Sequence, residues 1–75
     1  MASSDIRDFY LGRIKFAMGG SFTQREEILR MVARTAFRDY SLTNADYVII
    51  LDNVKEAHKK SMEMMRNEVW NGEHI

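Results

Sequence analysis

The chain has 75 residues with no cysteine and no proline, so it forms at most one small domain and has neither disulfides nor thiolate metal sites. Eleven basic and eleven acidic residues give a net charge of zero. This balance disfavours general binding to nucleic acid or to anionic membranes, because both require an excess of positive charge on some face. No apolar run is long enough to span a membrane, and the start MASSDIRDF lacks the pattern of a signal peptide. We therefore expect a cytoplasmic protein.

The first helix is predicted over residues 5–18, with Ser4 as its N-cap. Apolar residues cover more than half of its circumference, which is typical of a helix that touches two neighbours. The pair Gly19-Gly20 then ends the helix. The apolar residues are Ile6, Phe9, Tyr10, Leu11, Ile14, Phe16, Ala17 and Met18.

The second helix is predicted over residues 24–39. Thr23 and Glu26 have the spacing of a capping box, in which each side chain bonds the backbone N–H of the other residue. The apolar face of this helix consists of Ile28, Leu29, Val32, Ala33, Ala36, Phe37 and Tyr40.

On the opposite side of the second helix, three arginines recur every four residues, Arg30, Arg34 and Arg38. This arginine ridge has three interpretations: a solvated face, a contact for an acidic protein partner, or a contact for the phosphates of a nucleic acid. Glu26 and Glu27 can form ordinary helical ion pairs with Arg30, which favours the solvated face.

The third helix is predicted over residues 44–70, a length of about 40 Å. Thr43 with Asp46 has the spacing of a second capping box. The segment YVIIL has strand propensity, but no second run of this kind could pair with it, so we expect helix. The apolar stripe of this helix consists of Tyr47, Leu51, Val54, His58, Met62, Met65 and Val69.

The predicted fold is therefore an all-α, three-helix domain with a long third helix, whose last turns, SMEMMRNEVW, lie beyond the other two. Methionine suits adaptable surfaces, and tryptophan is favoured at interface hot spots. Met62 and Met65 on the stripe can instead belong to the core. So small a core is marginal, and dimerisation would enlarge it. The residues predicted to meet a second copy or a partner are Leu11, Met18, Ile49, Met62, Met64, Met65 and Trp70.

No catalytic, metal-binding or cofactor-binding residues are predicted. His58 lies on the apolar stripe, which is typical of a partly buried histidine with one hydrogen bond. Asp52 and Glu56 share a face, but nothing nearby completes a metal site. The second and third helices could form a helix-turn-helix, yet Asp46 and Asp52 would then oppose phosphates and bases.

The sequence therefore favours a small non-enzymatic regulator, inhibitor or adaptor that binds another protein. Phages and plasmids carry accessory proteins of this kind. We expect the chain to form a homodimer. One alternative is a nucleic-acid-associated transcription modulator that uses the arginine ridge. Another alternative is an obligate structural subunit of a larger complex.

Overall fold

A computed structural model describes residues 2–73 of the chain and the side chains of residues 2–72. It contains three α-helices, α1 over Ser3–Ala17, α2 over Phe22–Phe37 and α3 over Asn44–Glu73, and no strand within the described range. The predicted all-α, three-helix domain with a long third helix is therefore confirmed. The segment YVIIL lies inside α3, so its strand propensity does not decide its structure.

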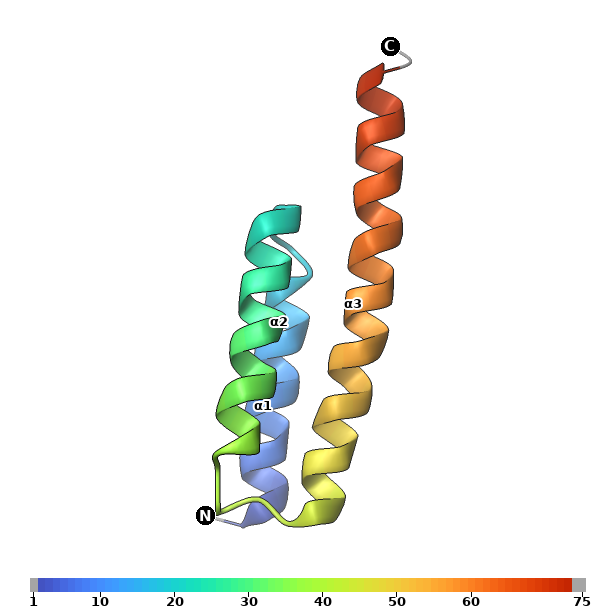
Figure 1. The fold of residues 1–75 in the computed structure, drawn as a ribbon. Helices are drawn as coiled ribbons and strands as arrows, with labels where there is room; N and C mark the ends of the chain where they lie inside the picture. The colour runs from blue at the N-terminus through green and yellow to red at the C-terminus, as the bar shows by residue number, and fades with distance from the viewer. Residues whose placement is uncertain (1, 74–75) are drawn as a thin grey trace.

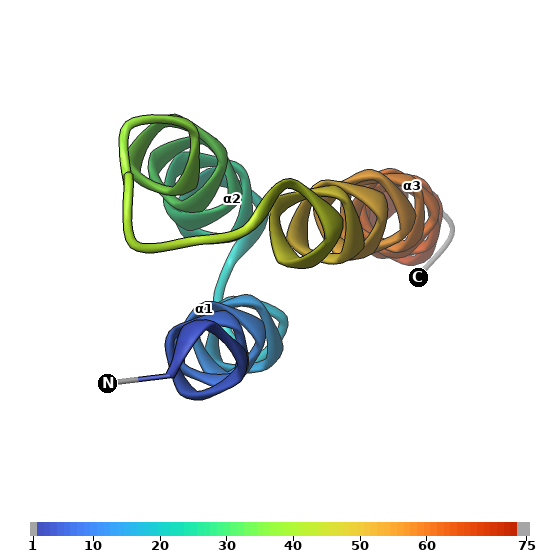
Figure 2. The same cartoon turned by 90° about the horizontal axis from the view of Figure 1, so that it is seen from below.

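The three helices form a bundle that is triangular in cross-section, with α3 packed against both other helices (Figure 2). α1 and α3 run in the same direction, α2 runs back, and the end of α3 projects beyond both (Figure 1). α3 has 30 residues and α2 has 16, which correspond to about 45 Å and about 24 Å of helix. The molecule is accordingly 49 Å long and 16 Å wide. None of the helices in residues 2–73 is long and apolar enough to cross a membrane.

The start of α2 differs from the prediction by two residues. Ser21, not Thr23, forms the capping box: Ser21 Oγ accepts from Gln24 N at 3.4 Å, and Gln24 Oε1 accepts from Ser21 N at 3.1 Å. Both Ser-x-x-Gln and Thr-x-x-Glu satisfy the motif. The turn after α1 leaves Ser21 with the extended backbone that an N-cap requires. Glu26 is thereby released from the cap and contacts His58 instead.

The core is a narrow line of side chains along the inner face of each helix. Four aromatic side chains that were assigned to apolar faces lie outside it, since their exposed fractions are 63% for Phe9, 75% for Phe16, 73% for Phe37 and 100% for Tyr40. Each helix of a three-helix bundle buries only the side that faces its two neighbours, and the apolar arcs of α1 and α2 are wider than that side. The buried apolar residues are Tyr10, Ile14, Ala17, Leu29, Val32, Ala36, Ile50 and Ala57.

The buried face of α3 is rotated from the predicted stripe by about 80° on a helical wheel. Its fully buried residues are Ile50 and Ser61, with Ala57 at 7% exposure. The predicted stripe instead lies on the side toward α2, where Tyr47 meets the ring of Phe37 at 6.2 Å. His58 is exposed and not partly buried, because it lies at the edge of the contact with α2. The side of α3 that faces α1 carries small and polar residues. The spacing of apolar residues therefore did not identify this side as a contact with α1.

Candidate functional site

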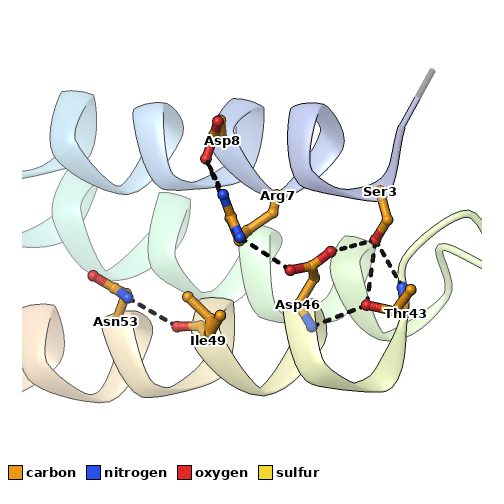
Figure 3. Close-up of polar contacts among 7 residues, drawn as sticks. All are labelled: Ser3, Arg7, Asp8, Thr43, Asp46, Ile49 and Asn53. Atoms are coloured by element: carbon orange, nitrogen blue, oxygen red, sulfur yellow. Dashed lines mark hydrogen bonds and ion pairs between the residues drawn. The ribbon is translucent and has the colours of Figure 1, made fainter.

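One polar network joins the start of α1 to the start of α3 (Figure 3). α1 begins at Ser3 and its N-cap Ala2 makes no side-chain hydrogen bond, so the predicted cap at Ser4 is wrong. Ser3 Oγ instead donates to Asp46 Oδ2 at 2.5 Å and accepts from Thr43 N at 2.9 Å. Thr43 Oγ1 accepts from Asp46 N at 3.2 Å, so half of the predicted capping box forms. In the other half of a capping box, the Asp46 carboxylate would accept from Thr43 N, and here Ser3 Oγ accepts this hydrogen bond instead.

Charge adds to this network. Arg7 Nη1 lies 3.1 Å from Asp46 Oδ1, and Arg7 Nη2 lies 3.1 Å from Asp8 Oδ1. The hydrogen bond from Ser3 is the largest cause that lowers the pKa of Asp46, and Arg7 lowers this pKa further. The carboxylate oxygens of Asp46 therefore bind groups within the bundle, and we assign the network to the stability of the fold and not to a ligand.

A second polar cluster is built around Arg25, which is only 1% exposed. Its Nε donates to Ser61 Oγ at 2.9 Å, its Nη2 to Ser61 O at 3.2 Å, and its Nη1 to Gly20 O at 2.9 Å. Nη1 also lies 3.3 Å from Glu68 Oε1. The guanidinium thus fastens the start of α2 and the preceding turn to α3.

Sequence reasoning did not identify Arg25, although a signal was present. Arg25 lies four residues before Leu29 and seven before Val32, so it shares the buried face of α2. The three arginines of the ridge lie on a different face of α2 from Arg25, and all three are exposed.

The structure does not bring the arginine ridge around one site. Arg34 and Arg38 line a depression of about 550 Å³ with Tyr10 and Asp39, whereas Arg30 lines another beside Glu26 and His58. Tyr10 donates to Asp39 Oδ2 at 2.7 Å. Burial, this hydrogen bond and the charge of Asp39 raise the pKa of Tyr10 to about 12, so the hydroxyl stays protonated at neutral pH. The carboxylate beside Arg34 and Arg38 lowers the positive charge of that depression.

Glu26 and His58 form a second polar contact between α2 and α3. His58 Nδ1 lies 2.5 Å from Glu26 Oε1, while Glu26 Oε2 is buried without a hydrogen-bond partner. Within residues 2–72, no group of three or more histidine, aspartate or glutamate side chains is placed to hold a metal ion.

Exposed apolar side chains line a depression on the outer face of α1 and α2, on the side away from α3. We call this the α1–α2 groove: a depression of about 580 Å³ lined by Phe16, Ala17, Gly19, Gly20, Gln24, Glu27, Ile28 and Met31. Phe16 is 75% exposed and Met31 is 50% exposed. Phe9 lies seven residues before Phe16, on the same side of α1, but its ring is partly engaged by Arg13 at 6.0 Å and by Tyr10. Phe16, Ile28 and Met31 are therefore the main apolar contacts that this groove offers.

The predicted interface residues are dispersed over the molecule. Leu11 and Met18 are half-buried and line a depression between α1 and α3. Ile49 is 40% exposed near the start of α3, and Trp70 is 59% exposed near its end. Met62, Met64 and Met65 are half-buried where α3 leaves the bundle.

From Arg66 to Gly72, all described side chains of α3 are exposed. We call this segment the α3 overhang.

Comparison of the chain with protein-family models, with curated proteins and with solved structures finds no match.

Proposed function

We propose that this chain is a small non-enzymatic regulator or adaptor that binds an amphipathic helix of another protein in the α1–α2 groove. The observation that carries the proposal is the exposure of Phe16 and Met31, 75% and 50%, on either side of one depression. Apolar side chains that gather at an open depression are typical of protein-binding surfaces, whereas scattered ones are not.

The shape and chemistry of the groove suit a helix. The groove follows the line between two adjacent helices, and its base contains the half-buried Ile28 and the fully buried Ala17. Gln24 and Glu27 supply polar and acidic groups at its edge. A helix with apolar residues at three- and four-residue spacing and a basic flank would match this pattern.

The experiment that tests this function uses the tagged chain as bait and compares two variants, each of which replaces two exposed large side chains with alanine. The groove variant is Phe16→Ala with Met31→Ala. The control is Phe37→Ala with Tyr40→Ala, which removes side chains that are 73% and 100% exposed, one at the last residue of α2 and one in the link that follows it. A partner identified with the wild-type bait is then purified, and its affinity for each variant is measured by calorimetry.

We expect 1:1 binding that the groove variant weakens by at least tenfold, which corresponds to about 1.4 kcal/mol, and that the control leaves unchanged. Circular dichroism checks that both variants are folded. A partner that binds the groove variant as tightly as the wild type would refute the use of this face.

A second candidate function rests on Arg34 and Arg38, which are exposed together and line one depression with Thr35 and Ser41. Two guanidinium groups beside two hydroxyl groups could contact consecutive phosphates. Affinity for a DNA or RNA fragment should then fall steeply with salt, and Arg34→Glu should weaken binding and reduce that slope. Binding that is equal for wild type and Arg34→Glu would exclude this function.

A further inference from the structure

The α3 overhang projects beyond α1 and α2 (Figure 1), and its ion pair with another helix of the described chain is that of Glu68 with Arg25 of α2. It comprises seven residues in helical conformation, about two turns, and Val69 within it is 49% exposed. These two turns continue α3, but most helical stability in proteins comes from tertiary packing, and these exposed turns have little of it. The overhang would therefore gain stability from a surface that covers it.

The α1–α2 groove has the length and chemistry to be that surface. Its α2 side extends from Gln24 to Met31, which is about 10 Å of helix and matches the overhang. The overhang offers Val69 as an apolar residue and Arg66 as a cation, while the groove offers Ile28, Met31 and the acidic Glu27. Neither Arg66 nor Glu27 forms an ion pair with another described residue.

A chain cannot fill its own groove, because the groove is lined only by α1, α2 and the turn between them, and α3 packs on their other side (Figure 2). A second copy placed end to end can fill it. The end of α3 projects beyond α1 and α2 (Figure 1). When the projecting ends of two molecules point toward each other, each overhang can therefore pass along the outer face of the other copy's α1 and α2. A two-fold axis makes the exchange reciprocal, so that both grooves and both overhangs are covered at once.

We propose that two copies of this chain form an antiparallel dimer in which the α3 overhang of each lies in the α1–α2 groove of the other. The inference rests on the proposed function in that both use this groove, and it adds regulation: the dimer occupies the site, and a foreign helix must displace the overhang. Each copy contributes seven overhang residues and eight groove residues. Stable interfaces use about 20 or more residues a side, so the dimer dissociates on dilution.

The first test is cross-linking, for which the absence of cysteine in the chain is an advantage. A Met31→Cys chain is mixed with a Val69→Cys chain and treated with a short bis-maleimide. The control replaces Val69→Cys by Val48→Cys, a valine of similar exposure, 52%, near the start of α3. We expect a cross-linked dimer from the first mixture and at least tenfold less from the control mixture or from either chain alone. Equal yields in the first mixture and the control would overturn the proposal.

The second test is sedimentation equilibrium of the full chain over a concentration series. We expect a monomer–dimer equilibrium whose Kd rises at least tenfold with Val69→Glu and also rises with Arg66→Glu or Glu27→Arg. The double variant Arg66→Glu with Glu27→Arg should restore part of the affinity, because it re-forms the ion pair with reversed sign. A chain that is monomeric at all concentrations, or a dimer that none of these changes weakens, would overturn the proposal.

Failure of this dimer and failure of the proposed function give different results. If only the dimer is wrong, the chain is monomeric and a foreign partner still depends on Phe16 and Met31. If only the foreign partner is wrong, the dimer forms and the groove variant loses it, but no other protein competes with the overhang.

Discussion

Removal of the Arg25 side chain should destabilise the protein by about 2–4 kcal/mol. Arg25→Ala leaves Ser61 Oγ, which is fully buried, and the carbonyl oxygen of Gly20 without their donor. An unsatisfied buried polar group costs about 1–3 kcal/mol. The lost packing of the buried aliphatic stem adds to this cost. Glu68 is 55% exposed, so its carboxylate returns to water and contributes at most about 1 kcal/mol.

A double-mutant cycle separates the hydrogen bond from the packing. Arg25→Met keeps much of the volume but removes the donors, and Ser61→Ala removes the hydroxyl that they bind. Each single change leaves one buried partner unsatisfied, whereas the double variant replaces both with apolar groups. We therefore expect the double variant to be more stable than the sum of the two single effects by about 1 kcal/mol or more.

The assay is urea unfolding followed by circular dichroism at 222 nm, with Arg34→Met as the control. Arg34 is exposed on the same helix, so this change should alter the free energy of unfolding by no more than about 0.5 kcal/mol. The reasoning is refuted if Arg25→Ala costs less than about 1 kcal/mol, or if the two changes in the cycle are additive.

Two further predictions concern Gly20 and Ser3. Gly20→Ala should destabilise by about 0.5–2 kcal/mol through loss of the α2 cap, because the new Cβ would lie 2.9 Å from Oε1 and 3.2 Å from Cβ of Gln24. The Cβ added by Gly12→Ala meets no atom within 4 Å, so this change should stabilise the protein by about 0.5–1 kcal/mol. If the urea midpoints of the Gly20→Ala and Gly12→Ala variants shift in the same direction, this reasoning is contradicted. A lowered folded-state pKa, as at Asp46, contributes stability above the unfolded pKa of about 3.9 and loses it as pH falls through the folded value. Ser3→Ala should therefore cost more stability at pH 7 than at pH 2 in thermal melts, and a difference independent of pH would count against the Ser3–Asp46 bond.

The existence and order of the helices could be predicted from sequence because the signals are local. Helical apolar spacing, the Gly19-Gly20 turn and the hydroxyl of Thr43 act on residues within about four positions. Where two local signals competed, as at Ser21 and Thr23, the choice depended on the path of the preceding turn. The boundary of α2 was accordingly displaced by two residues.

The candidate site could not be predicted in the same way. A helical wheel shows that α1 has a wide apolar arc, but it does not say which part faces the neighbouring helices. The structure buries Tyr10, Ile14 and Ala17 and leaves Phe9 and Phe16 exposed. The groove beside Phe16 exists only because α2 lies next to that uncovered part of the arc.

The sequence by itself determined that this protein is three helices, with the third longer than the others, because helix formation depends on neighbouring residues along the chain. Only the tertiary structure decided which faces are buried and which remain available. Arg25 illustrates the reason. A charged side chain avoids the interior unless oxygen atoms are placed to receive its hydrogens, and here the buried acceptor is Ser61, which lies 36 residues away in the chain. Packing of α2 against α3 brings these two residues together.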